Sequence, residues 1–320
     1  MKRKVAIIGT GKIARYLKQR LEDMKLEVCF MINRSNSNSF ELLLKTEKPK
    51  AVFLTISTLD KGEKARDYIL LCAKYGVPVI TCEKGALAYH MLKLWEHLET
   101  IGHTACVGGG TGIIQLVKNL NIDIKEKIEI EVVLNGTLNY IFHQMASGIS
   151  LEEACDEARR LGYAEPNATD SLSLVNGELK DVIMKTCAFF NTALANGRFI
   201  TPHEFGKFEL SSADLEKLQA GDDYRMMVFF SNHKILSEPH FVGKKFRRHK
   251  IGGKWDIMGG FVSISNSNFY PWIPGGVGNA VHVIDKSEYS FGECMMSGQG
   301  AGVRPTVAVM LEDYRTLCWK

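Results

Sequence analysis

A short apolar run near the start of the chain, Val5-Ala6-Ile7-Ile8, leads directly into Gly9-Thr10-Gly11-Lys12-Ile13-Ala14. This second segment has the spacing G-x-G-x-x-A and lies between a predicted strand and a predicted helix over residues 12–24. In such a turn the first glycine permits the tight bend, the second lets the backbone approach a pyrophosphate, and the alanine keeps the helix close to the sheet. The amino end of the helix offers unpaired N–H groups to the anion. We therefore predict a dinucleotide site with contacts from Gly9, Gly11, Lys12 and Ile13; a tight turn without a ligand is the alternative.

The end of the next predicted strand, at residues 28–33, bears on which dinucleotide is bound. Sites for NAD usually place Asp or Glu there to bind the ribose hydroxyls, whereas this chain has Ile32-Asn33-Arg34-Ser35. The planar guanidinium of Arg34 suits a 2′-phosphate. We therefore predict NADP rather than NAD, with Arg34 as a contact; an arginine in a solvated loop is the alternative. Ser57, at the end of a third apolar run over residues 51–57, is a further candidate contact or a plain turn serine.

Strand and helix patterns alternate up to about residue 120, with predicted strands at residues 4–9, 28–33, 51–57, 77–82 and 103–107. Such alternation predicts an α/β fold with a Rossmann-type, doubly wound parallel sheet. Strands and helices are mixed after residue 125, and one predicted helix, at residues 151–161, begins with a capping box of Ser150 and Glu153. For the 320 residues we predict a dinucleotide-binding domain over residues 1–124, an α+β domain over 125–304, and a helix over 305–320 that returns to the first domain.

The charge balance indicates no polyanionic partner. The chain has 40 Lys and Arg against 36 Asp and Glu, a net charge of +4, so neither nucleic acid nor a membrane is expected as a partner. The basic run at residues 244–250 is interpreted as a solvated hairpin. No apolar run approaches the roughly 18 residues of a membrane span, and the N-terminal run is interpreted as a strand rather than a signal peptide. The eight cysteines contain no C-x-x-C pair and the nine histidines lack ligand spacing, so we expect a cytoplasmic protein with reduced thiols and no metal.

Three groups of segments are more specific than the composition. The first is Thr81-Cys82-Glu83-Lys84-Gly85-Ala86-Leu87-Ala88. The second joins Asn135-Gly136-Thr137-Leu138-Asn139-Tyr140-Ile141 to Leu161-Gly162-Tyr163-Ala164-Glu165-Pro166 and to a helix that reaches Lys180. The third is Gly298-Gln299-Gly300-Ala301-Gly302, ahead of Pro305-Thr306. Together with residues 107–110 and 278–281, these segments resemble the homoserine dehydrogenase family over nearly the whole chain, and least between about residues 199 and 270.

The resemblance implies an NAD(P)-dependent dehydrogenase of amino-acid biosynthesis, usually a homodimer, that interconverts homoserine and aspartate 4-semialdehyde. It implies that residues 125–304 carry catalysis and dimerisation. Lys180 and Lys84 match catalytic or substrate-binding positions of the family. Lys84 is also expected to contact the cofactor. Thr137 and Glu165 match substrate-contacting positions, and Gly300 belongs to a segment that closes over the cofactor. An ammonium group suits this chemistry because reduction of an aldehyde places negative charge on oxygen; a solvated lysine on a helix is the alternative for Lys180.

Several positions depart from the family pattern. Asn176 and Ser171 stand where the family has aspartates, so we expect Asn176 to contact the substrate through a hydrogen bond without a charge. Glu83 replaces the asparagine that usually precedes the lysine, and a carboxylate beside Lys84 would favour its charged form. Thr104 stands where family members can carry a glutamate for a monovalent cation.

These departures leave three functions open. The first is an NADP-dependent dehydrogenase acting on homoserine or a close analogue. The second is a dehydrogenase on the same scaffold for a different small aldehyde or amino acid. The third is a regulatory protein that binds NADP without catalysis. Retention of Lys84 and Lys180 favours the enzymes, whereas loss of the aspartates favours the other two.

Overall fold

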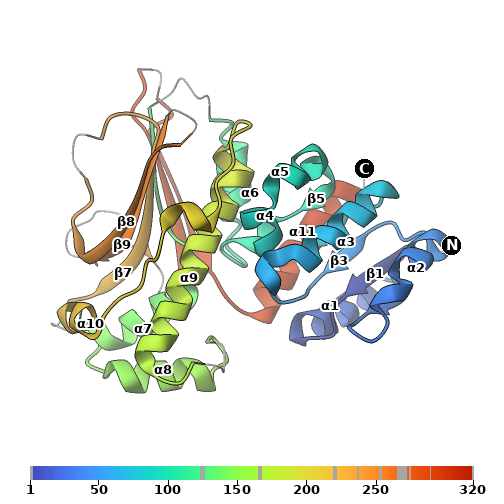
Figure 1. Ribbon diagram of the computed structural model, residues 1–320, viewed down its shortest axis with the longest axis horizontal. Coiled ribbons are helices and arrows are strands. Elements are labelled where there is room, and N and C mark those ends of the chain that lie inside the picture. The colour runs from blue at the N-terminus through green and yellow to red at the C-terminus, as the bar shows by residue number, and fades with distance from the viewer. Residues whose placement is uncertain are drawn as a thin grey trace. The chain divides into compact units, whose positions relative to one another are not determined.

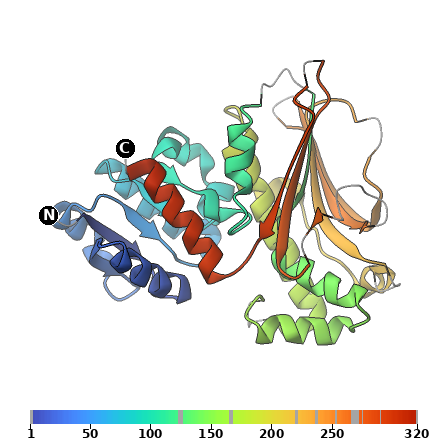
Figure 2. The ribbon, with the colours of Figure 1, turned by 180° about the vertical axis from the view of Figure 1, so that it is seen from behind.

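The chain folds into two compact units, Met1–Gly112 with Gly302–Lys320 and Ile113–Ala301. The computed structural model (Figures 1 and 2) describes residues 3–122, 127–164, 168–218, 222–235, 238–251, 254–264, 272–273, 275–288 and 290–318. The junction between the units follows residue 112, because helix α6 (Ile113–Asn119) packs on elements of the second unit. The sequence prediction places the junction after residue 124. Each unit is described separately below.

The first unit is built on a parallel five-stranded sheet with the order β2-β1-β3-β4-β5, which confirms the predicted fold class. The order reverses at β1, and ligands of such sheets bind at the carboxyl ends of the strands beside this switch point. The strands are β1 (Lys4–Ile8), β2 (Glu27–Ile32), β3 (Val52–Leu54), β4 (Val79–Thr81) and β5 (Ile101–Gly102). The helices and short turns are α1 (Lys12–Asp23), η1 (Ser37–Ser39), α2 (Phe40–Glu47), η2 (Asp60–Gly62), α3 (Glu63–Lys74), α4 (Gly85–Tyr89), α5 (Met91–Leu94), η3 (Trp95–Thr100), η4 (Thr104–Cys106) and α11 (Val303–Cys318).

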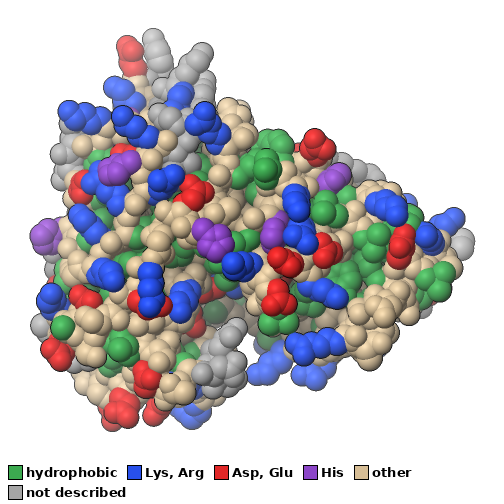
Figure 3. Space-filling model, in the orientation of Figure 1, with side chains coloured by type: hydrophobic (Ala, Val, Ile, Leu, Met, Phe, Trp, Pro, Cys, Tyr) green, Lys and Arg blue, Asp and Glu red, His purple; other side chains and the backbone are tan. Residues whose placement is uncertain are grey.

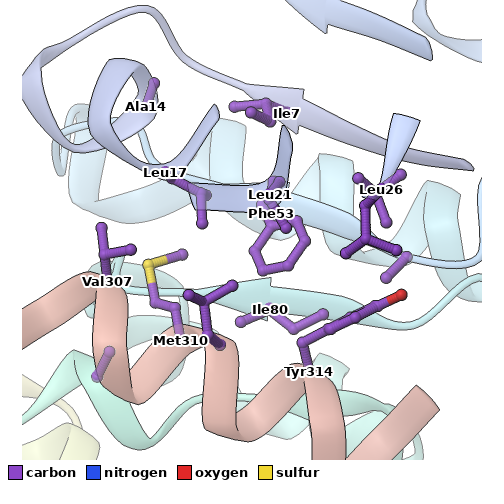
Figure 4. Packing of buried hydrophobic residues seen from close by; sticks show 14 residues of the cluster. Ile7, Ala14, Leu17, Leu21, Leu26, Phe53, Ile80, Val307, Met310 and Tyr314 are labelled. Carbon is purple, nitrogen blue, oxygen red and sulfur yellow. The ribbon is translucent and has the colours of Figure 1, made fainter. Parts of the chain in front are cut away.

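The core of this unit joins both ends of the chain. Figures 1 and 2 show α3 on one side of the sheet and α11 on the other. Side chains of α11, among them Met310 and Tyr314, pack with Leu17 of α1 against Phe53 and Ile80 of the sheet (Figure 4). The rings of Phe53 and Tyr314 lie 5.5 Å apart. Burial of this apolar surface holds the last helix against the parallel sheet.

The predicted strand at residues 103–107 is wrong. The strand β5 ends at Gly102, and Thr104–Cys106 form the 3-10 turn η4. The backbone N–H of Thr104 donates to Asp313 Oδ2 of α11 at 2.9 Å, so its hydrogen-bond partner is a side chain of the last helix and not a neighbouring strand. The partner lies 209 residues away in sequence, so a local apolar pattern carries no sign of it.

The second unit contains an antiparallel six-stranded sheet with the order β11-β10-β6-β7-β9-β8. Its strands are β6 (Ile128–Val133), β7 (Tyr224–Ser231), β8 (Phe241–Ile251), β9 (Trp255–Ser263), β10 (Gly278–Asp285) and β11 (Glu293–Gln299). The other elements, besides α6, are α7 (Gly136–Ala146), α8 (Leu151–Arg160), α9 (Ser171–Phe189), the π-helical turn η5 (Phe190–Leu194), η6 (Pro202–Phe205) and α10 (Ser212–Leu218). Helix α8 begins with the predicted capping box, since Ser150 and Glu153 exchange side-chain and backbone hydrogen bonds.

The basic run at residues 244–250 lies on β8, an edge strand that forms a hairpin with β9, as predicted. Figure 3 shows Lys and Arg side chains over the region where Figure 1 labels β8 and β9. Arg248 pairs with Glu204 at 3.1 Å, and Lys245 and Arg247 both pair with Glu238. Charged side chains on an edge strand discourage pairing with another chain.

Candidate active site

A cavity of about 890 Å³ lies in the first unit at the carboxyl ends of β1, β2 and β3. Four predicted cofactor contacts line it, namely Gly9, Gly11, Arg34 and Ser57. Lys12 and Ile13 form the first turn of α1 without being part of the lining. The cavity also has lining residues that the sequence did not single out, among them Asn33, Thr55, Leu59, Asp60, Lys64 and Tyr68.

The glycine turn at the floor of this cavity has the geometry of an anion cradle. Gly9 has a φ of +117°, and a Cβ there would lie 2.5 Å from Thr55 Oγ1, so only glycine fits. Gly11 is the N-cap of α1, and a Cβ on it would meet no atom within 4 Å. The first turn of α1 has no capping side chain and no acidic residue. A helix amino end without a capping side chain or a carboxylate suits an anion such as the pyrophosphate of a dinucleotide.

Arg34 projects from a turn that two asparagines hold in place. Asn33 Oδ1 accepts hydrogen bonds from the Ser35 N–H and hydroxyl at 2.8 and 2.7 Å, and Asn36 Oδ1 accepts from the Asn33 N–H at 2.7 Å. The Arg34 side chain is exposed at the cavity wall. Among the described residues it has no carboxylate partner. An ordered turn that carries an uncommitted guanidinium is suited to bind a phosphate.

Lys84 is the N-cap residue of α4 in the first unit and follows the end of β4 after Cys82 and Glu83. The preceding Glu83 is only 2% exposed. Its carboxylate accepts hydrogen bonds from the Gly85 N–H at 2.6 Å and the Ala86 N–H at 2.9 Å. Glu83 therefore anchors the turn from which Lys84 extends.

In the second unit, one face of α9 carries Asn176 and Lys180. The Asn176 amide donates to the Leu210 carbonyl at 3.0 Å and accepts from the Leu210 N–H at 2.7 Å. Lys180 is 68% exposed and pairs with Glu209 Oε1 at 3.1 Å. Lys207 and Lys180 together hold the pKa of the Glu209 carboxyl below its ordinary value. Both predicted residues thus bind to the segment at residues 207–210, Asn176 through hydrogen bonds to Leu210 and Lys180 through an ion pair with Glu209.

A different face of α9 carries a cluster that the sequence reasoning missed. Asn135, the N-cap of α7, accepts from the Leu138 N–H and donates through Nδ2 to Glu178 Oε2 at 2.7 Å and Asp181 Oδ2 at 3.1 Å. Lys185 Nζ lies 2.8 Å from the same Asp181 oxygen, and its side chain is only 15% exposed. The i,i+4 spacing of Asp181 and Lys185 was visible in the sequence, but their proximity to Asn135 depends on the packing of α9 on α7.

Thr137 lies at the start of α7 beside this cluster. It is buried, and its hydroxyl donates to the Tyr163 carbonyl at 2.8 Å. Glu165 lies outside the described residues. Ser171 is the first residue of α9, and Asp170 caps the helix by accepting from the Ser173 N–H at 2.7 Å. The Ser173 bonds lower the pKa of the Asp170 carboxyl.

Gly300 directly follows β11 in the second unit. Its N–H donates to the Val277 carbonyl at 2.9 Å. A Cβ on Gly300 would lie 2.1 Å from Asn279 Cγ, so packing in this unit already requires glycine. Closure of this segment over a cofactor remains a prediction.

The parallel sheet, its strand order and the glycine turn at the switch point place the chain in the Rossmann class of proteins. The family model of homoserine dehydrogenase matches residues 113–242. The chain is 34% identical over 152 residues to the homoserine dehydrogenase of Methanocaldococcus jannaschii, covering 46% of this chain and 45% of that protein. It is 30% identical over 218 residues to that of Sulfurisphaera tokodaii, covering 67% of each. The chain therefore belongs to the homoserine dehydrogenase family.

Coverage and fold similarity add two facts. The matched part spans about half the length of several curated relatives, such as 50% of the Helicobacter pylori homoserine dehydrogenase. A hyperthermophilic archaeal homoserine dehydrogenase mutant in complex with NADPH superimposes with a TM-score of 0.66, covering 99% of this chain and 98% of that one. At 19% identity this similarity shows the fold.

Within the residues that the structure describes, it contains neither a candidate metal site nor a candidate membrane span. No group of three His, Cys, Asp or Glu side chains there is arranged to hold a metal ion. No helix within those ranges is both long and apolar enough to cross a membrane.

Proposed function

We propose that this chain is an NADP-dependent oxidoreductase that interconverts homoserine and aspartate 4-semialdehyde, or a close analogue, by hydride transfer. The open amino end of α1 at Gly11, with Arg34 at the wall of the same cavity, is the observation that carries the proposal. The turn fits a pyrophosphate, and the uncommitted guanidinium fits a 2′-phosphate. The bound cofactor supplies or accepts the hydride, and the chain's own residues bind and orient the substrate and handle the proton.

The proton step requires an ammonium group held in a fixed position. Lys84 and Lys180 are the predicted groups for it. Lys185 is a third candidate, and the geometry of the second unit favours it over Lys180. Lys185 is largely buried and oriented by Asp181, whereas Lys180 is mostly solvent-exposed and paired with Glu209. In the direction of aldehyde reduction, we propose that Lys185 gives its proton to the alkoxide oxygen that forms from the aldehyde.

The direct test of this proposal follows NADPH absorbance with aspartate 4-semialdehyde and with a panel of small aldehydes. Rapid oxidation of NADPH with aspartate 4-semialdehyde is expected. Turnover only with another aldehyde would instead support a dehydrogenase with a different substrate. NADPH binding without turnover of any aldehyde would support the regulatory alternative.

We also propose that the protein is a homodimer. Analytical ultracentrifugation tests this oligomeric state.

Replacing Arg34 with alanine is expected to weaken NADPH binding about tenfold and to leave NADH binding nearly unchanged, because only NADPH carries a 2′-phosphate for the lost hydrogen bonds. Titration calorimetry with both cofactors measures this difference. The matched control is Arg20→Ala, because Arg20 lies on the exposed side of α1 and pairs with Asp23. Equal affinity of the unmodified protein for NADPH and NADH would contradict the proposed role.

Asn176→Asp restores the family's carboxylate, but the structure predicts a loss of stability. The Leu210 carbonyl accepts a hydrogen bond from Asn176 Nδ2 at 3.0 Å. An aspartate carboxylate cannot donate this bond, and its oxygen would face the carbonyl oxygen as a second acceptor. We expect the free energy of unfolding in urea to fall by about 1–3 kcal/mol. Asn38→Asp, on the exposed turn η1, is the control. An unchanged unfolding free energy with a gain in homoserine turnover would instead show that Asn176 contacts the substrate.

A further inference from the structure

A strained loop forms one wall of the proposed cofactor cavity. Ile56, Ser57, Leu59, Asp60 and Gly62 all line it. Asp60, Lys61 and Gly62 have φ values of +47°, +55° and +80° in succession. Non-glycine residues in this left-handed region cost roughly 1 kcal/mol or more each. Such a loop keeps its shape only where the surrounding structure holds it.

The loop is held by the segment that carries Lys84. A Cβ on Gly62 would lie 2.3 Å from the Ala86 nitrogen, so the two backbones are in direct contact. A Cβ on Gly85 would lie 2.6 Å from Thr58 Cγ2. Glycine on both sides therefore allows the cavity loop and the start of α4 to pack against each other.

One buried carboxylate joins the two segments by hydrogen bonds. Thr58 Oγ1 donates to Glu83 Oε1, which also accepts from the Gly85 N–H at 2.6 Å. Glu83 Oε2 accepts from the Ala86 N–H at 2.9 Å. Glu83 is 2% exposed, and hydrogen bonds to a buried charge are among the stronger ones in proteins. The asparagine usual at this position has one carbonyl oxygen and an NH₂ group, so it cannot accept at both ends as the carboxylate does.

We propose that Glu83 is a positioning residue that acts through Thr58. Its carboxylate fixes the strained cavity loop against the turn that presents Lys84, and so keeps the cofactor wall preformed. This inference rests on the proposed cofactor site in the first unit. It assigns a function to the glutamate that stands beside Lys84 where the resemblance implies an asparagine.

Thr58→Val tests this link because it removes the hydroxyl and keeps the shape. The Gly85 and Ala86 N–H groups still satisfy the carboxylate, so the fold is expected to persist. NADPH fluorescence titration is expected to show affinity about tenfold weaker, because the loop must now be ordered during binding. Thr58→Ser, which keeps the hydroxyl, is expected to restore affinity to within about twofold. Thr100→Val removes a hydroxyl that donates to the His97 carbonyl at 2.8 Å outside the cavity, and it is the matched control.

The thermal midpoint and the steady-state constants of the same variants separate positioning from general stability. We expect the KM for NADPH to rise with Thr58→Val while the KM for the aldehyde stays unchanged. A Thr58→Val protein with wild-type NADPH affinity and KM would overturn the inference, whether or not its melting temperature falls. Equal losses with Thr58→Ser and Thr58→Val would also overturn it. An unmodified protein that fails to bind NADPH would refute the proposed cofactor site itself, and the inference with it.

Discussion

A protein with valine in place of Gly11 is expected to fold normally and to bind neither NADPH nor NADH. The backbone at Gly11, with φ −70° and ψ −171°, is open to any residue. A Cβ there meets no atom within 4 Å, so the valine branches enter the space that the pyrophosphate requires. Loss of two charge-assisted hydrogen bonds to phosphate corresponds to at least about a hundredfold weaker affinity. Fluorescence titration measures the affinity, and circular dichroism measures the fold.

Two other glycines provide the controls for this prediction. Gly177 also has open space around it but lies on α9, outside the cavity, so Gly177→Val should leave cofactor affinity unchanged. Gly9→Val should damage the fold itself, because its φ is +117° and its Cβ would overlap Thr55 Oγ1. A folded Gly11→Val protein that binds NADPH as tightly as the unmodified chain would show that the pyrophosphate does not lie over this turn.

The parallel sheet of the first unit and its glycine turn were predictable because their signals are local in sequence. Gly9 and Gly11 act within a single turn between β1 and α1, and the absence of a carboxylate beside Arg34 is visible in four consecutive residues. The capping box of Ser150 and Glu153 is local in the same way. In each case the residues that determine the structure are within a few positions of one another, so spacing and side-chain chemistry suffice.

The remaining structure depends on partners far apart in sequence. Asp313 on α11 accepts from the backbone N–H of Thr104, where an apolar pattern predicted a strand. Leu210 engages Asn176, and Asn135 engages Asp181. Thr58 reaches Glu83 across 25 positions. Residue type alone did not indicate which face of α9 would meet α7. One face carries Asn176 and Lys180, and the other carries Asp181 and Lys185, so each face has a lysine four positions after a polar or acidic residue.

That ambiguity on α9 leads to the second large expected effect. Lys185→Ala is expected to lower kcat by about 10²-fold to 10⁴-fold, the usual cost of removing a group that transfers a proton in the transition state. Lys180→Ala is expected to stay within about threefold, because a mostly exposed ion pair contributes little and Lys207 still pairs with Glu209 at 2.7 Å. Stopped-flow or steady-state measurement of NADPH oxidation, at saturating aldehyde, provides both values. NADPH affinity should be unchanged in both variants, since the predicted phosphate contacts lie in the first unit.

Lys185→Arg distinguishes chemistry from structure in this pair. Arginine keeps the positive charge beside Asp181 but does not give up a proton near neutral pH. If Lys185 only neutralises Asp181, arginine should restore both the thermal midpoint and kcat. If Lys185 delivers the proton, arginine should restore the thermal midpoint while kcat stays low. A large loss of kcat with Lys180→Ala and none with Lys185→Ala would show that the assignment from the family resemblance is correct, and that the Asn135–Asp181–Lys185 cluster serves only to hold α9 against α7.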